Sequence, residues 1–486
     1  MTMKTFTKRI LTAMLSMALL AMLCIPGFAA STATVSTEST HTFELYQVFT
    51  GDVSNNKLTN VKWGQNANTG AAASAEAAAE ALLDKDAKEA AAYVDYNSTP
   101  VATVSKDASA SVASGYYIAK DVTTLAKGES YSDIIVKVVG ADVVLSPKSN
   151  TAPNFNKKIY DVNDSTETLS GEMVKYDESG WQDSADYDIG DSVPMRLQGT
   201  VPEDIDKYAH YYYAFHDVME QGLTFEKIEN VYVNGTALSE DAYEVTTNGN
   251  QMNVIIKDLK PYAKANDKVN VYYTAKLNET AHNGSYGEVN EAWLEYSANP
   301  QDTTSPTDEE YPKDTNETEH DKVIVFTYNV VVNKVDTQGN ALAGAEFELY
   351  KKLADGTEKK IELTKNDDGT VFTAVGIDDG TYVLKETTPP SGYNAIEDTE
   401  FTVTAAHNAV WEAEERTTVL TSLSGGDLFT GEVSTGALTA NVENKAGAEL
   451  PTTGGTGTVL LYVLGGILVI GAGVLLITKY RVSKEH

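Results

Sequence analysis

Short segments in which apolar and polar residues alternate, separated by turn residues, recur through most of this 486-residue chain. Successive side chains of a strand point to opposite faces, so this alternation predicts β-strands with one buried face. Seven such segments follow one another between residues 154 and 300, and their spacing favours an immunoglobulin-like sandwich. They read NFNKKIYDV, DSVPMRLQGTV, YYYAFHDV, NVYVNG, QMNVIIKDL, KVNVYYTAKL and NEAWLEYSA.

The same pattern marks two further units. Residues 30–150 are predicted to form an N-terminal domain, loose at residues 30–40 and mostly β, with an Ala/Glu/Lys-rich insert at 70–93 that favours helix. The middle domain is placed at 151–300, an acidic linker at 301–321 and another all-strand domain at 322–448. The predicted fold class is therefore mainly β, with tandem immunoglobulin-like sandwiches.

The N-terminus carries an export signal. Basic residues at 4, 8 and 9 precede an apolar run over 10–28, and small residues follow, which predicts a signal peptide over 1–29. The only cysteine, Cys24, lies inside it, so we expect no disulfide in the mature chain. The net charge of −33 argues against nucleic acid as a partner and suits a soluble extracellular surface.

Residues 450–486 have the order of a cell-wall sorting signal. An apolar segment over 459–478 is long enough for one transmembrane helix, and a basic tail follows. An ordinary single-pass anchor would share these two features. The five preceding residues match the pattern LPxTG, however, and they are Leu450, Pro451, Thr452, Thr453 and Gly454. The match implies a Gram-positive sortase substrate, cleaved after Thr453 and held in the membrane only transiently.

Polar residues of three types fall on apolar strand faces in both sandwiches. Each domain has a lysine on its first strand, an acid midway and an asparagine on its last strand. The two sets are Lys157, Asp217 and Asn290, and Lys334, Glu386 and Asn444. Burying an unpaired charge is costly, so a buried ion pair or exposure at a strand end is the alternative explanation.

These sets contain the groups that a spontaneous Lys–Asn isopeptide bond requires. Burial lowers the pKa of a lysine and raises that of a carboxylic acid, so a proton moves and an uncharged amine faces the amide. The acid polarises the asparagine carbonyl, the amine attacks and ammonia leaves. Asp217 and Glu386 would then be catalytic once, for their own domain only. Lys158 adjoins Lys157, and strand parity favours Lys157.

These residues carry a resemblance to a known family. VVVNKVDTQGNALAGAEFELYK, GTYVLKETTPPSGY and NVENK resemble the lysine, glutamate and asparagine motifs of Cna B-type domains in sortase-assembled backbone pilins. NFNKKIYDV, YYAFHDVMEQGLTF and VNEAWLEYS resemble the Cna A-like middle domain of such pilins. The resemblance implies isopeptide bonds Lys157–Asn290 and Lys334–Asn444, and a covalent cell-surface fimbria that supports adhesion or colonisation. It also implies a class C pilus sortase, a housekeeping sortase, further copies of the chain, accessory pilins and peptidoglycan as partners.

A polymerising pilin also needs a lysine that accepts Thr453 of the next subunit. Lys313 lies in YPK within the acidic linker, and Lys148 lies in SPK at the junction of the first two domains. The resemblance favours Lys148, because backbone pilins keep their pilin motif at this junction. A monomeric wall-anchored adhesin without such a lysine is the alternative.

A wall-anchored enzyme has little support in the sequence. The seven histidines lack metal-ligand spacing, and no phosphate loop or nucleophile elbow appears. We therefore expect no enzyme beyond the self-processing step, no cofactor and no metal. Loops such as KNDDGT could bind calcium, but an ordinary hairpin turn is the preferred explanation.

Overall fold

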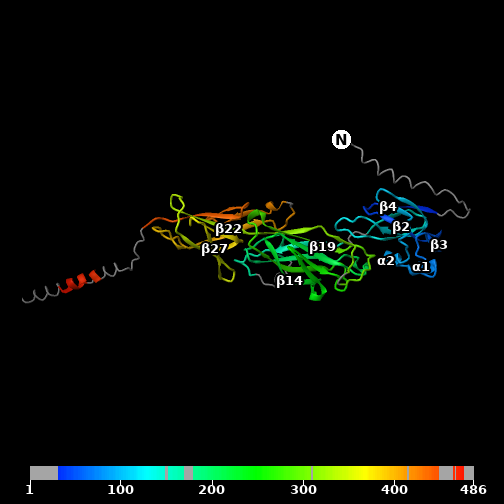
Figure 1. Ribbon diagram of the computed structural model, residues 1–486, viewed down its shortest axis with the longest axis horizontal. Helices are drawn as coiled ribbons and strands as arrows, with labels where there is room; N and C mark the ends of the chain where they lie inside the picture. The colour runs from blue at the N-terminus through cyan, green and yellow to red at the C-terminus, as the bar shows by residue number, and fades with distance from the viewer. Residues whose placement is uncertain are drawn as a thin grey trace, which may run out of the picture. The chain divides into compact units, whose positions relative to one another are not determined.

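The computed structural model describes residues 31–147, 152–168, 179–307, 310–412, 415–447, 463–465 and 467–474 (Figure 1). Thirty-one strands make up most of the regular structure of these residues, which confirms the mainly β prediction. The chain divides into two compact units. The first holds Met1–Thr124 and Tyr131–Ser149, and the second holds Leu125–Ser130 and Asn150–His486.

The first unit contains two sheets. One has the order β5-β1-β8, and the other has the order β3-β2-β6-β7 with β4 paired to β2. Their bounds are β1 Thr32–Thr37, β2 Phe43–Ser54, β3 Lys57–Trp63, β4 Ala102–Val104, β5 Ala110–Ala113, β6 Gly115–Asp121, β7 Ile134–Val138 and β8 Val143–Leu145. The loose start predicted for residues 30–40 is wrong, because Thr32–Thr37 form strand β1. Ala33, Val35 and Thr37 point into the core, although most residues of this segment are polar.

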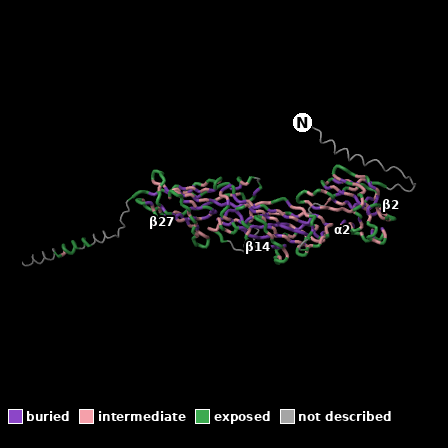
Figure 2. The backbone as a smooth tube through the Cα atoms, viewed as in Figure 1, coloured by how far each residue is buried: buried purple, intermediate pink, exposed green. Residues whose placement is uncertain are grey.

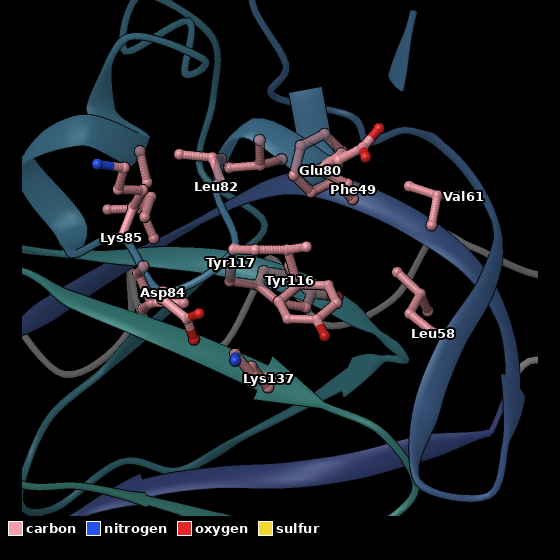
Figure 3. Close-up of a pocket in the computed structure, with 16 residues that line it drawn as sticks. Phe49, Leu58, Val61, Glu80, Leu82, Asp84, Lys85, Tyr116, Tyr117 and Lys137 are labelled. Atoms are coloured by element: carbon pink, nitrogen blue, oxygen red, sulfur yellow. The ribbon is translucent and has the colours of Figure 1, made fainter. Parts of the chain in front are cut away.

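The predicted helical insert forms two short helices instead of one. They are α1 (Ala75–Ala81) and α2 (Ala87–Ala91). Helix α1 ends at Ala81 with Leu82 as its C-cap, and Asp84, with a positive φ of 60°, lies between the two helices. Asp86 then begins the second with a capping box that involves Glu89. A cavity of about 350 Å³ lies beside α1, with Phe49, Leu58 and other apolar side chains around it (Figure 3).

The middle part of the chain is a sandwich of two sheets, with orders β10-β9-β12-β18-β14-β15 and β11-β21-β19-β13-β17-β16, and β20 pairs with β19. The first sheet comprises β9 Phe155–Tyr160, β10 Trp181–Gln182, β12 Ser192–Thr200, β14 Leu223–Val233, β15 Thr236–Ala237 and β18 Lys268–Leu277. The second comprises β11 Ser184–Asp186, β13 Tyr213–Met219, β16 Glu244–Asn248, β17 Gln251–Ile256, β19 Glu288–Ser297, β20 Thr315–Glu317 and β21 Asp321–Phe326. One apolar core fills the space between them.

The C-terminal part forms a second sandwich, with sheet orders β25-β26-β22-β31-β30 and β24-β23-β27-β28-β29. The first sheet comprises β22 Tyr328–Val335, β25 Thr364–Lys365, β26 Val371–Ile377, β30 Thr430–Glu432 and β31 Ala437–Glu443. The second comprises β23 Glu346–Lys352, β24 Glu358–Ile361, β27 Gly380–Thr388, β28 Thr399–His407 and β29 Leu420–Ser424. Buried and exposed residues alternate along these strands (Figure 2). Four 3-10 turns complete the described structure at Ile205–Lys207, Glu240–Ala242, Gly284–Tyr286 and Arg416–Thr418.

Strand β21 connects the two sandwiches. It pairs with β19 and β11 of the middle sandwich. Its residues Ile324 and Phe326 nevertheless belong to the core of the C-terminal sandwich, whereas Val323 and Val325 belong to the middle core. Because the side chains of this strand alternate between two cores, it serves both sandwiches at once.

The predicted terminal signals lie mainly outside the described residues. The signal peptide and the LPxTG residues fall outside them entirely. Residues 463–465 and 467–474 are helical and lie inside the predicted 459–478 segment. Within the described part of the chain, none of the helices reaches the length and apolar character needed to cross a membrane.

Candidate functional site

The structure brings Lys157, Asp217 and Asn290 together in the middle sandwich, and we call these residues the middle triad. Lys157 lies on β9 in one sheet, and Asp217 and Asn290 lie on the adjacent strands β13 and β19 of the other. All three are fully buried. The triad therefore spans the sandwich from one sheet to the other.

A dense set of polar contacts links the middle triad. The Lys157 amine contacts the Asp217 carboxylate directly. Tyr273 on β18 joins all three residues. Its hydroxyl lies 2.5 Å from Lys157 Nζ, donates to Asp217 Oδ2 at 2.6 Å and accepts from Asn290 Nδ2 at 3.1 Å. Two oxygens, Asp217 Oδ1 and Asn290 Oδ1, have no hydrogen-bond partner among the described residues.

The electrostatics of this pocket lower the pKa of the Lys157 amine. Burial lowers the pKa of Lys157, and the nearby Asp217 carboxylate only partly opposes it. Burial and the same carboxylate raise the pKa of Tyr273 well above its usual value, so the phenol keeps its proton. Our sequence reasoning missed Tyr273, although Val271, Tyr273 and Ala275 follow the inward parity of their strand.

The neighbouring lysine has different surroundings. Lys158 pairs with Asp183, and its side chain is 26% exposed, whereas the Lys157 side chain is 0% exposed. Lys158 thus points to the opposite face of β9, as the alternation of a strand requires. The structure brings Lys157 to Asp217 and Asn290 and places Lys158 elsewhere.

The structure also brings together Lys334, Glu386 and Asn444, which we call the C-terminal triad. Lys334 lies on β22, and Asn444 directly follows β31, the parallel neighbour of β22. The backbone amide of Asn444 donates to the Val335 carbonyl at 3.1 Å. Glu386 comes from β27 in the opposite sheet, and all three residues are buried.

The amide and the carboxylate of the C-terminal triad are already paired. Asn444 Nδ2 donates to both Glu386 oxygens, at 2.9 and 3.0 Å, and Asn444 Oδ1 has no partner among the described residues. Among the described residues, the Lys334 amine donates to two backbone carbonyls, those of Val442 at 2.7 Å and Val335 at 3.2 Å. Burial lowers the pKa of Lys334, with Glu386 opposing the change. Carbonyls that carry no charge do little to hold a proton on this amine.

A third fully buried lysine, Lys351 on β23, has the opposite character. Its amine contacts three carboxylates, those of Asp378, Asp164 and Asp188. Although burial acts to lower its pKa, these acids raise it above its usual value. Lys351 is therefore a charged member of an ion cluster, unlike the lysines of the two triads.

The structure describes one of the two candidate acceptor lysines, Lys313. Lys148 lies outside the described residues. Lys313 is exposed, with 72% of its side chain open to solvent. The residues before it are fixed, since Tyr311 stacks on Tyr212 with ring centroids 4.6 Å apart and Pro312 is buried. The Lys313 amine is thus presented at the surface by an ordered backbone.

Two family models match the chain. Residues 328–417 match the prealbumin-like fold domain named SpaA, which covers most of the C-terminal sandwich. Residues 442–483 match the LPXTG cell wall anchor motif, which covers the predicted sorting signal. The fold and the anchor together define the class, a cell-wall-anchored surface protein built from tandem β-sandwiches.

Individual proteins similar to this chain give a more specific comparison than the class does. The chain is 25% identical over 407 residues to the trypsin-resistant surface T6 protein of Streptococcus pyogenes serotype M6, covering 69% of this chain and 70% of that protein. Its fold resembles the T6 backbone pilin of that serotype, with a TM-score of 0.54, 18% identity and coverage of 87% and 100% of the two chains. It also resembles the full-length major pilin SpaD of Corynebacterium diphtheriae, with a TM-score of 0.51, 18% identity and coverage of 86% and 98%.

These findings agree with the resemblance to sortase-assembled Gram-positive backbone pilins, and the anchor motif indicates a cell-surface protein anchored to the cell wall. They confirm the resemblance found in the sequence motifs. The anchor motif indicates a surface protein that a sortase handles as a substrate.

Proposed function

We propose that the chain is the shaft subunit of a covalent pilus, in which each copy is linked through Thr453 to a lysine of the next. Homology to backbone pilins supports the shaft role. The observation that carries the rest is the recurrence of one arrangement, a buried lysine beside an acid and an asparagine, in both sandwiches. In each domain the lysine lies on an early strand and the asparagine on a late one, so a bond between them would tie together the two ends of that domain.

In this proposal, each triad forms an isopeptide bond after folding. The neutral amine of Lys157 or Lys334 attacks the side-chain carbonyl carbon of its asparagine, a C–N bond forms and the bond to Nδ2 breaks. The amine gives up one proton, the leaving nitrogen gains one, and ammonia departs. Asp217 and Glu386 carry this proton and polarise the carbonyl. The oxygens Asp217 Oδ1 and Asn290 Oδ1 have no hydrogen-bond partner among the described residues, which leaves both available for the proton that the reaction moves.

We further propose that a class C pilus sortase makes the link between subunits and that a housekeeping sortase passes the base of the fibre to peptidoglycan. Lys148 is the preferred acceptor, by its position between the first two domains, and Lys313 is the second candidate. The exposure of the Lys313 amine supports its inclusion. The proposed domains are 30–150, 151–300 and 322–448, with β21 shared between the last two.

Two measurements test the proposal. Cells that assemble a pilus should yield a ladder of very large species on a denaturing gel, and Lys148→Ala should collapse it while Lys313→Ala should not. A single band from wild-type cells would favour the monomeric wall-anchored adhesin. Intact mass tests the bonds separately. The secreted chain should weigh about 34 Da less than its sequence mass, at about 17 Da for each ammonia lost. The full sequence mass would refute both bonds.

A further inference from the structure

Three aromatic rings form a stack on the outer face of the middle sandwich, and we call them the histidine clasp. The ring of Trp293 on β19 lies between those of His216 on β13 and His320, which directly precedes β21. The ring centroids of His216 and Trp293 are 5.2 Å apart. Those of Trp293 and His320 are 4.5 Å apart, with an angle of 8° between the rings. Each histidine therefore lies against one face of the same indole.

The hydrogen bonds of His216 require a proton on both ring nitrogens. Its Nδ1 lies 2.7 Å from Asn253 Oδ1, and its Nε2 lies 3.0 Å from Glu295 Oε2. Both of these oxygens are acceptors, whereas a neutral imidazole has only one N–H to donate. Two further bonds support the orientation of the Asn253 amide, because its Oδ1 accepts from Gln251 Nε2 at 2.9 Å and its Nδ2 donates to Thr246 Oγ1 at 3.1 Å. The geometry thus fits an imidazolium ion at His216.

The charged side chains that face the clasp are mostly acidic. They come from β19, β20 and one loop, and they are Glu291, Glu295, Glu317 and Lys127. Glu291 Oε1 lies 2.8 Å from His320 Nδ1, and Glu317 Oε1 lies 3.8 Å from His320 Nε2. Lys127 pairs with Glu317 at 2.8 Å and offsets one of the three acids. The remaining negative charge favours a cation within the stack.

The partners of His216 stabilise its charged form. Burial acts to lower the pKa of His216, but its hydrogen bonds to Glu295 and Asn253 raise it above its usual value of 6.5. Burial acts to raise the pKa of Glu295, yet its hydrogen bonds to His216 and Thr315 lower it. A cation over the face of an indole is also attracted by the negative π-face of the ring. The pair of His216 and Glu295 is therefore a charge-assisted hydrogen bond.

Both ends of strand β20 are tied to the clasp. The hydroxyl of Thr315, the first residue of β20, donates to Glu295 Oε1 at 2.6 Å. The same acid binds His216 through its other oxygen. Glu317, the last residue of β20, faces His320. A change in the charge of the stack therefore acts on β20 directly.

Strand β20 in turn holds two neighbouring segments. Lys313, with its exposed amine, lies two residues before the strand. On the other side, the Gly128 amide donates to the Glu317 carbonyl at 2.8 Å, and Asn316 Nδ2 donates to the Ala126 carbonyl at 2.6 Å. Loosening β20 would therefore free the end of the linker that presents Lys313 and the contacts of residues 125–130.

We propose that the histidine clasp is a pH-sensitive fastener, which holds β20 on β19 while His216 carries a positive charge and loosens it when that charge is lost. Because the pKa of His216 is raised, the folded state binds this proton more tightly than the unfolded chain, whose imidazole titrates near 6.5. The contribution to stability is full below about pH 6.5 and is lost as the pH rises through the higher pKa of the folded state. This device goes beyond the shaft role and needs neither of the proposed isopeptide bonds.

The first part of the test is an NMR titration of the secreted chain with its histidines labelled at Cε1. The signal of His216, assigned by its loss in His216→Phe, should titrate with a midpoint above pH 6.5. Phenylalanine keeps an aromatic ring in the stack but carries no charge. Glu295→Gln removes the carboxylate on Nε2, so it should lower this midpoint.

The second part is hydrogen exchange, corrected for the intrinsic pH dependence of the exchange reaction. The Thr318 amide directly follows β20 and donates to the Leu294 carbonyl at 3.0 Å. It should be roughly fivefold less protected at pH 8.5 than at pH 5.5, and His216→Phe should remove this difference. His210→Gln is the matched control, because this histidine also contacts a carboxylate, that of Asp258 at 2.7 Å, but lies outside the clasp.

The clasp is supported by a midpoint above pH 6.5 together with a pH-dependent protection that His216→Phe removes and His210→Gln keeps. Three results overturn it: a wild-type midpoint at or below pH 6.5, equal protection at both pH values, or a difference that persists in His216→Phe. Loss of the difference in His210→Gln would also overturn it. Exchange of β12 and β18, in the opposite sheet, is the folding check for each variant. The wild-type measurements decide the question even where a variant fails to fold.

Discussion

Replacing Glu386 by glutamine should leave the C-terminal sandwich folded but without its cross-link. The amide keeps the size of the glutamate and can still pair with Asn444, which contacts both Glu386 oxygens at about 3 Å. It cannot carry the proton that the reaction moves. Lys334 is buried among neutral carbonyls, so its amine remains free but does not react.

The size of the effect follows from the loop that the bond closes. Lys334 and Asn444 are 444 − 334 = 110 residues apart. The loop-entropy relation for a covalent cross-link gives roughly 4 to 5 kcal/mol for this length. For a domain of this size the midpoint of thermal unfolding should fall by roughly 15 to 20 °C.

The assay combines mass and melting on the same sample. Glu386→Gln should weigh about 17 Da more than the wild-type chain, apart from the substitution itself, and should melt at a lower temperature. Glu400→Gln is the matched control, because Glu400 lies on the same sheet but forms only an exposed pair with Lys352. An unchanged mass deficit in Glu386→Gln would refute the role of the acid. A lost bond with no change in melting would refute the loop-entropy estimate.

Three further outcomes are expected. Tyr273→Phe should slow cross-linking of the middle sandwich roughly tenfold, measured by intact mass during refolding, because one hydrogen-bonding hydroxyl that touches the whole triad is lost. Lys157→Ala should halve the mass deficit of the chain, whereas Lys158→Ala should leave it intact. In the first unit, burial raises the pKa of Asp133 from 3.8 to about 6, so the folded state holds this proton more tightly than the unfolded chain. The contribution of Asp133 to stability should therefore be full below about pH 4 and fall by about 3 kcal/mol as the pH rises to 6, and Asp133→Asn should abolish this contribution in hydrogen exchange of β6 and β7.

Strand parity was sufficient to predict most of the fold and both triads. A residue that shares a face with buried apolar neighbours must point inward, so Lys157 and Lys334 could be placed in the cores without a structure. The same rule would have found Tyr273. It fails where the pattern is weak, as in β1, where small and polar residues provide the alternation, and in the insert at 70–93, where helix propensity cannot locate the break at Asp84.

The joint between the two sandwiches was beyond the reach of sequence reasoning. Strand β21 pairs in parallel with β11, and its alternate residues enter two different cores. Long-range contacts of this kind depend on how two domains join, which alternation along single strands does not encode.

Three lysines of the described structure are fully buried, and the charges around their amines differ. Lys157, Lys334 and Lys351 are equally hidden from water, so desolvation acts on all of them in the same direction. Lys351 meets three carboxylates, and its pKa rises. Lys157 meets one carboxylate with a tyrosine hydroxyl, and Lys334 donates to carbonyls that carry no charge, so both lysines have a lowered pKa. Burial is thus necessary for a nucleophilic lysine but does not suffice. The number of negative charges within contact distance sets the direction of the pKa shift, and the proposed bonds use the two lysines whose pKa is lowered.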